Sequence, residues 1–233
     1  MGRTSGDAFG AALALLLMLA AGRGYAGCDD RPMANVDWSQ CDKARLNLGG
    51  DDLSGADFSH ADLSGSDLRN TRLTGAKATE ANLMRARFDA ADLSGADFTK
   101  ASLDRSHFEG ANLSGAVLVK AELPRATLTK AKLVGADLSK AELIRAVLTD
   151  ADLSNAKLID AYLMRSDLRH AVFAKADLTD AIFDRADLRG ADLSAAVGLE
   201  QGQLKHTCGD ASTLLPAGLT PPPDWPCAPD ADD

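Results

Sequence analysis

Six arginines that recur at intervals of twenty residues are the side chains best suited to recognition chemistry in this chain. They are Arg85, Arg105, Arg125, Arg145, Arg165 and Arg185. A guanidinium is permanently charged and donates hydrogen bonds in a fork that matches carboxylates and phosphates. The column therefore predicts either a binding site for an anion or partner, or a solvated corner in which the arginines alternate with Asp104, Asp184, Glu122 and Glu142.

Apolar residues beside three of these arginines favour a partner. The residues directly before Arg125, Arg145 and Arg165 are apolar, whereas Ser59 and Ser64 occupy similar positions near the start of the repeat. Apolar groups concentrated on a surface often mark an interface. We predict a contact patch for another protein that consists of Arg125, Arg145, Arg165, Ile144, Tyr162 and Met164. Pro124 belongs to the same apolar group as Ile144 and Met164. Apolar residues on the other sides extend the trend: Val117, Val119, Val134, Val147, Ile159 and Val172.

Catalytic and metal-binding patterns are missing from the sequence. The four histidines are His60, His107, His170 and His206, and catalysis would need partners that converge around one of them. No phosphate loop, zinc motif or nucleophile elbow occurs. The many aspartates lack the Gly-Gly-x-Gly-x-Asp turns of calcium-binding repeats, so we interpret them as solvated. We expect no catalytic, cofactor-binding or metal-binding residue.

The elements that position these residues come from a five-residue repeat. The phrase Ala-Asp-Leu-Ser-Gly, as at residues 61–65 and 91–95, recurs with variations 28 times over residues 56–195, without an insertion or deletion. We call its central Leu or Phe the pivot. Pivots fall at every fifth residue from Phe58 to Leu193, and only Ala78 is neither Leu nor Phe.

A period of five fits neither an α-helix, with 3.6 residues per turn, nor a strand, which alternates every two. A short extended piece followed by a corner would instead point the pivot and the small residue two before it inward. Four such sides close a square coil and predict a period of twenty, which the arginine column obeys. A second column supports it and favours a corner with positive φ: Gly75, Gly95, Gly115, Gly135 and Asn155.

These residues resemble the pentapeptide repeat family, whose pattern is a small residue, a polar residue, Leu or Phe, and two variable residues. The resemblance implies an all-β fold, a right-handed quadrilateral β-helix of about 7 to 8 coils with short N- and C-terminal caps. Inward Ala and Leu predict a narrow interior without a cavity for a sizeable ligand. Function in such a fold depends on the outer surface.

The resemblance also implies an alternative role, mimicry of DNA by an acidic β-helix that engages topoisomerases, as in quinolone-resistance pentapeptide proteins. The whole chain has a formal charge of −9, but residues 56–195 hold 21 acidic and 19 basic residues. A nearly neutral coil with an arginine column imitates DNA phosphates poorly. We therefore expect no nucleic-acid partner and keep an inhibitor or immunity-type protein as the alternative function.

The start of the chain has the features of a secretory signal. Residues 1–26 contain Arg3, an apolar stretch over 11–21 and a small-residue cleavage site at 24–26. The segment is too short to span a membrane stably. Residues 25–28 also end like a lipobox, which leaves a lipid anchor at Cys28 as the alternative. We expect an exported protein, periplasmic or secreted.

Four cysteines suit an oxidising compartment and structural disulfides. Of three connectivities, the simplest pairs Cys28 with Cys41 and Cys208 with Cys227. Zinc is less compatible because no Cys-x-x-Cys occurs. The predicted organisation is a signal peptide (1–26), an N-terminal cap with an irregular first coil (27–55), the β-helix (56–198) and a Pro-rich, disulfide-pinned cap (199–233) in which Trp225 and Leu214 cover the last coil. We expect a monomer or weak dimer that acts as a non-enzymatic binding or scaffold module.

Overall fold

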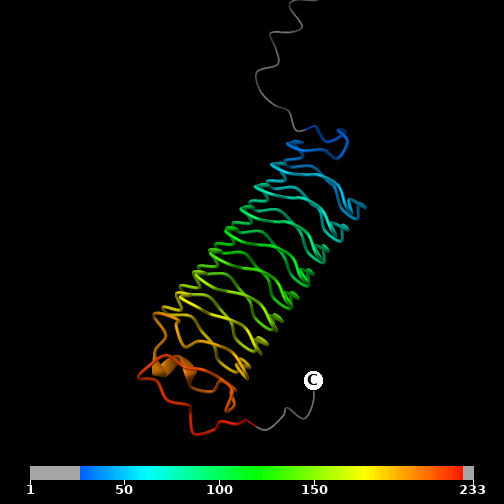
Figure 1. Cartoon of the computed structure of the whole chain (residues 1–233). Helices are drawn as coiled ribbons and strands as arrows, with labels where there is room; N and C mark the ends of the chain where they lie inside the picture. Colours follow the sequence, from blue (N-terminus) through cyan, green and yellow to red (C-terminus); the bar gives the residue numbers. More distant parts are fainter. Residues whose placement is uncertain (1–26, 228–233) are drawn as a thin grey trace, which may run out of the picture.

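The computed structural model describes residues 27–227, which form a rod of stacked four-sided coils (Figure 1). Parallel bridges join residues twenty apart, from Asp37 with Asp57 to Asp177 with Val197. Residues 36–195 are 160 residues, so they make eight coils of twenty. The period of twenty predicted from the sequence is confirmed. The expected signal segment, residues 1–26, lies outside the described residues.

Each side of a coil is too short to form a continuous strand. Only the residue before the pivot, which we call the outward residue, pairs with the coils above and below, and every such bridge is isolated. In residues 27–227 the sole helix or strand element is a 3₁₀ helix, η1 (Gln201–Leu204). The all-β expectation is therefore met in part. The chain is a β-helical solenoid, but its bridges do not join into sheets, because a corner interrupts the chain after every three extended residues.

The corners are tight turns formed by the two residues after the pivot, here the first and second corner residues. The N–H of Ala61 donates a 2.9 Å bond to the carbonyl of Phe58, three residues earlier. Within residues 36–195, positive φ is confined to second corner residues, the pattern of a type II turn. Gly75 has φ of 65°, and Arg145 has φ of 59°. The glycine column has positive φ as predicted, but it is not a special corner, because the other three corners of the coil have positive φ as well.

The interior is a stack of pivots and small residues. The pivots and small residues of the middle coils are 0–1% exposed, and Phe88 stacks on Phe108 with ring centroids 4.8 Å apart. Beside Ala78 lies a cavity of about 10 Å³ lined only by apolar side chains, including Phe58, Phe88 and Phe98. This volume is too small for more than one water-sized molecule.

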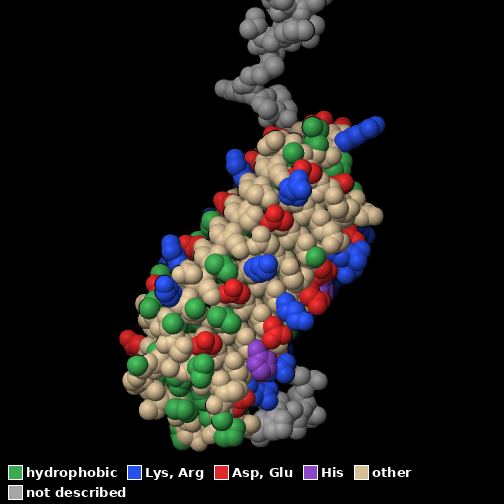
Figure 2. Space-filling view, in the orientation of Figure 1, with side chains coloured by type: hydrophobic (Ala, Val, Ile, Leu, Met, Phe, Trp, Pro, Cys, Tyr) green, Lys and Arg blue, Asp and Glu red, His purple; other side chains and the backbone are tan. Residues whose placement is uncertain are grey.

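Hydrophobic side chains emerge on the outside toward the C-terminal end of the rod. In the view of Figure 2 they are more numerous there than over the upper middle of the molecule. The large hydrophobic side chains most exposed beyond residue 160 are Tyr162, Val172, Ile182, Val197 and Leu214. No helix in residues 27–227 is long and apolar enough to cross a bilayer.

The first coil has a regular backbone, although we predicted an irregular one. Asp42 already bridges Asp62, so the irregularity is confined to side chains such as Lys43, which occupies a pivot position. The ammonium group of Lys43 lies 4.3 Å from the centroid of the Trp38 ring and donates to the carbonyl of Cys28. Cys28 pairs with the buried Cys41, and their Cα atoms are 5.5 Å apart.

The coil loses its period at the C-terminal end because extra residues are inserted. Asp187 bridges Cys208 and Asp192 bridges Leu214, so the spacing grows from twenty to 21 and then 22. The helix η1 replaces one side, and its Gln203 donates 2.8 Å hydrogen bonds to two carbonyls of the preceding coil.

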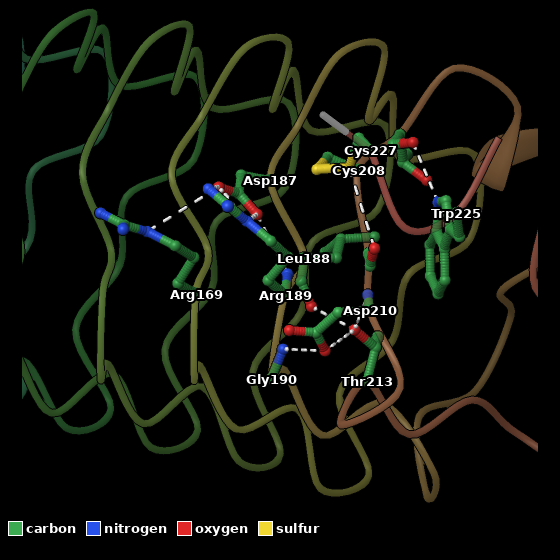
Figure 3. The surroundings of a disulfide bond; sticks show 12 residues. Arg169, Asp187, Leu188, Arg189, Gly190, Cys208, Asp210, Thr213, Trp225 and Cys227 are labelled. Carbon is green, nitrogen blue, oxygen red and sulfur yellow. Dashed lines mark hydrogen bonds and ion pairs between the residues drawn. A yellow bond between two sulfur atoms is a disulfide. The ribbon is translucent and has the colours of Figure 1, made fainter. Parts of the chain in front are cut away.

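A disulfide between Cys208 and Cys227 holds the last segment against this end (Figure 3). The indole N–H of Trp225 donates a 2.9 Å bond to the carbonyl of Thr207, and the ring packs over Gly209, where an added Cβ would come within 2.4 Å of it. Trp225 covers the end as predicted. Leu214 does not, because its outward bridge position leaves it 50% exposed, and Leu215 and Leu219 pack against the core instead.

Candidate functional site

Aspartates at outward positions stabilise the corners of the coil. A carboxylate oxygen of Asp92 accepts hydrogen bonds from the backbone N–H and the hydroxyl of Ser94, at 3.2 and 2.8 Å. The Ser94 hydroxyl is the largest cause of a pKa of Asp92 below its usual range. Similar bonds link Asp57 to the backbone of Ser59. The aspartate columns are therefore turn-closing groups and not merely the solvated side chains predicted from the sequence.

The histidines do not come together in the fold. His60 lies 3.5 Å from the carboxylate of Glu80, and His107 and His170 lie on a different side of the coil. His206 belongs to the C-terminal cap. Within residues 27–227, no group of three or more His, Cys, Asp or Glu side chains is arranged to hold a metal ion.

The six arginines form one continuous column along a single corner. All six are second corner residues, with φ between 54° and 59°. The N–H of Arg125 donates to the carbonyl of Ile144, and that of Arg145 to the carbonyl of Met164, both at 3.0 Å. Consecutive arginines therefore belong to adjacent coils, which stack about 4.8 Å apart. We call the side that ends in this corner, with pivots from Leu63 to Phe183, the arginine side.

Two of the six arginines are paired, whereas Arg85 and the three central arginines form no ion pair within residues 27–227. Arg105 lies 3.9 Å from Asp104, and Arg185 lies 3.9 Å from Asp184. Across the described residues, Arg125, Arg145 and Arg165 form no ion pair. Glu122 and Glu142, which we expected to alternate with them, form none either. The reason is positional, because the glutamates are outward residues in the middle of the side and the arginines stand at its corner.

The contact patch predicted from the sequence is contiguous in three coils. Ile144 and Met164 are half-buried first corner residues directly before their arginines, and Tyr162 is an outward residue that is 39% exposed. Tyr162 bridges Glu142 in the coil before and Ile182 in the coil after. Ile182, 41% exposed, extends the patch and was missed, although the period of twenty from Tyr162 would have indicated it.

Three columns with different chemistry therefore run side by side on the arginine side. The outward column is acidic and then apolar, the first corner column is apolar, and the second corner column is basic. Their members in the middle coils are Glu122, Glu142 and Tyr162, then Pro124, Ile144 and Met164, then Arg125, Arg145 and Arg165. Side chains of the first two columns are neighbours, as the contact between Asp92 and Ser94 on another side demonstrates. Such a surface can bind a partner with apolar groups flanked by charges.

The apolar residues predicted on the other sides contribute less than expected. Of that set only Val172, 37% exposed, is strongly exposed. The others are half-buried, because neighbouring coils cover much of each side chain: Val117, Val119, Val134, Val147 and Ile159. Large hydrophobic side chains that are exposed lie mostly toward the C-terminal end, at Ile182, Val197 and Leu214, besides Met33 and Met84 near the start of the rod.

Comparison with protein families gives a match over most of the coil. A family model described as pentapeptide repeats matches eight copies, over residues 52–89, 87–129, 121–160 and 161–197. These segments together span well over half of the chain. The comparison with curated proteins finds no match.

Several solved structures are similar. QnrB1, a plasmid-mediated fluoroquinolone resistance protein, is 24% identical over 73% of this chain and 88% of its own, with a TM-score of 0.63. A trypsin-treated variant of QnrB1 is 25% identical over 73% of this chain and 87% of its own, with a TM-score of 0.60. HetL from the cyanobacterium Nostoc sp. strain PCC 7120, a pentapeptide repeat protein involved in heterocyst differentiation regulation, is 28% identical over 87% of this chain and 89% of its own, with a TM-score of 0.41. The QnrB1 likeness concerns the fold.

Proposed function

Because the chain belongs to the pentapeptide repeat family, we propose that it is a right-handed, exported, non-enzymatic β-helical rod that binds another protein through its arginine side. The observation that carries this proposal is the unpaired middle of the arginine column beside exposed apolar side chains. Arg125, Arg145 and Arg165 lack the ion pairs that their neighbours Arg105 and Arg185 have among the described residues.

A rigid rod is well suited to binding by surface display. Every coil is held to the next by backbone hydrogen bonds, so the side chains of a column keep a fixed spacing. Since the backbone is already ordered, little conformational entropy is lost on association. Charged and apolar columns would then select a partner by shape and charge, without chemistry on that partner.

Export is supported by the pairing of all four cysteines at the two ends of the coil. Disulfides persist in oxidising compartments such as the periplasm or the extracellular space. The Cys28–Cys41 pairing opposes the lipid-anchor alternative, because one sulfur cannot form a disulfide and also carry a thioether to a lipid. Mass spectrometry of a nonreduced digest of the mature protein would distinguish a Cys28–Cys41 peptide from a lipidated one.

An inhibitor or immunity-type role that blocks a macromolecule is the second candidate. The printed role of QnrB1, fluoroquinolone resistance, belongs to that protein, and at 24% identity it supports only a shared fold. Mimicry of nucleic acid is opposed by the 19 basic residues among residues 56–195. Recovery of the mature chain from the cytoplasm would favour this second candidate over an exported binding module.

The experiment that tests the binding function is affinity capture from the exported fraction with three baits. They are the wild-type chain, the patch variant Arg145→Ala/Tyr162→Ala, and the control variant Lys132→Ala/Val172→Ala. The control removes one exposed basic and one exposed apolar side chain from the opposite side of the rod. We expect a protein that binds the wild type and the control but not the patch variant. An unchanged set of bound proteins with the patch variant would refute the assignment of the patch.

A further inference from the structure

We propose that the arginine side also binds a second copy of this chain, with the two rods parallel and the two arginine sides facing each other. This inference rests on the proposed function, because it names a partner for the same contact patch. It follows from three features of that side: unpaired charges of both signs, their order across the side, and the spacing of the coils.

Unpaired charges of both signs stand out on the arginine side. Glu122, Glu142, Arg125 and Arg145 are all exposed, and within the described part of the chain none of them forms an ion pair. On the neighbouring corner, by contrast, two lysines pair with acids in adjacent coils. Lys100 lies 2.8 Å from Glu80, and Lys140 lies 3.9 Å from Asp160.

The order of the columns makes the side complementary to itself. A two-fold axis that runs parallel to the rod through the first corner column exchanges the two edges of the side and keeps each coil at its own height. The outward column of one copy then faces the arginine column of the other. Glu122 meets Arg125 of the second copy, and Glu142 meets Arg145. In the coil after, Tyr162 meets Arg165, a pairing in which a guanidinium can stack on the phenol ring.

Apolar side chains fill the centre of this arrangement. Pro124, Ile144 and Met164 of one copy meet the same residues of the other, because the axis passes through their column. An apolar centre flanked by paired charges is the usual anatomy of a protein interface. Every contact away from the axis, such as that of Glu122 with Arg125, occurs twice, as an isologous two-fold interface requires.

The antiparallel arrangement is excluded by charge. A two-fold axis perpendicular to the rod would keep each column at the same edge and place arginine against arginine, with Arg145 facing an arginine of the other copy. Like charges placed opposite each other in an interface are strongly unfavourable.

The spacing of the coils favours a second β-helix over an extended peptide. The charged rows repeat about every 4.8 Å, the distance between stacked strands. Side chains on one face of an extended peptide repeat about every 6.6 Å, because they alternate at about 3.3 Å per residue. A peptide would lose register after one or two contacts, whereas a second copy has the same spacing at every coil.

Charge-swap variants test the proposal. In the two coils with pivots Leu123 and Leu143, Arg125→Glu/Arg145→Glu makes the charges of this side all acidic, and Glu122→Arg/Glu142→Arg makes them all basic. Both changes suit the fold, since Glu80 already occupies a second corner with φ of 56° and Arg72 an outward position. A control, Lys132→Glu/Lys175→Glu, reverses two exposed charges on the opposite side. The association of each mature chain, and of the two swap variants mixed, is measured by sedimentation velocity at low and high salt.

We expect the wild type and the control to dimerise at low salt, with a dissociation constant that rises at high salt because exposed ion pairs are screened. Each swap variant alone should associate at least about tenfold more weakly. Mixing the two swap variants should restore a dimer, since an acidic side then faces a basic one.

A wild type that stays monomeric, or swap variants that do not associate when mixed, would overturn the inference. The proposed binding of a foreign protein would still be decided separately, by the capture experiment. A foreign protein lost from the Arg145→Ala/Tyr162→Ala bait would still support that function, because mixing charge-swapped copies cannot restore binding to a foreign surface. Restored dimers, together with an unchanged set of proteins captured by the Arg145→Ala/Tyr162→Ala bait, would support the inference and refute binding of a foreign protein at this patch.

Discussion

Ala78 is the one pivot where the repeat departs from Leu or Phe, and we expect Ala78→Leu to destabilise the rod. If three extra carbon atoms fitted the interior, their burial would stabilise the fold by about 2 kcal/mol, at about 0.8 kcal/mol for each. The cavity beside Ala78 measures only about 10 Å³, so they do not fit. Overfilling a packed interior costs about 1–3 kcal/mol, so Ala78→Leu should lower the free energy of unfolding instead of raising it.

The cause lies in the neighbouring rings. Phe58 and Phe98 are the pivots one coil before and one coil after Ala78, and Phe98 meets Phe88 edge-on with centroids 6.0 Å apart. These rings occupy the space that a Leu pivot would need. The double variant Ala78→Leu/Phe98→Leu should recover much of the loss, with a coupling free energy of about 1 kcal/mol or more between the two sites.

Urea unfolding followed by circular dichroism measures the unfolding free energy of all four proteins in this double-mutant cycle: the wild type, the two single variants and the double variant. Leu138→Ala is the matched control, because Leu138 is a fully buried pivot in the same column with Leu118 and Leu158 around it. It should lose about 2–5 kcal/mol. A rise in the unfolding free energy of Ala78→Leu, or a coupling free energy near zero, would refute the argument that phenylalanine rings occupy the space of a leucine at position 78.

Two further predictions concern the C-terminal cap and the outward aspartates. Cys208→Ser/Cys227→Ser should release Trp225 from Gly209, because a disulfide over about twenty residues contributes about 3 kcal/mol. The coils should persist, since each repeat depends mainly on its neighbours. We expect stronger acrylamide quenching of tryptophan fluorescence with an unchanged far-UV circular dichroism spectrum; loss of the whole circular dichroism signal would contradict the prediction. The lowered pKa of Asp92 means that its stabilisation is present above the unfolded pKa of about 3.9 and is lost as the pH falls through the folded pKa. Asp92→Asn should therefore show a shallower fall in unfolding free energy below about pH 4 than the wild type, since Asn112 makes the same bonds to Ser114 without titrating; identical pH profiles would contradict this role.

The sequence predicted the coil well because its fold is local and repeated. Each five-residue unit contains its own extended piece and corner, so the inward Ala and Leu are visible without knowledge of distant contacts. The cysteine pairs were equally accessible, since each pair is close in sequence. Errors arose where the partners of a side chain depend on its position across a side of the coil, as for Glu122, whose separation from the arginine corner is not visible in the sequence.

The caps show the same limit. Proline density correctly indicated an irregular C-terminal segment, but the sequence could not decide which leucine covers the core. The insertions before Cys208 and Leu214 shift the register, so that Leu214 becomes an outward bridge residue and Leu215 turns inward. A shift of one residue reverses the direction of every side chain in an extended segment.

The sequence by itself therefore determined the period of twenty, the inward stack and the family, because these depend on residues a few positions apart. Only the tertiary structure decided that every corner requires positive φ, that the outward aspartates close the turns, and that the central arginines are left without partners. These properties depend on where neighbouring coils place their backbone and side chains in space. On the arginine side, the sequence indicated the columns, and the structure showed that Arg145 at the corner and Glu142 in the middle of the side form no ion pair in the described residues.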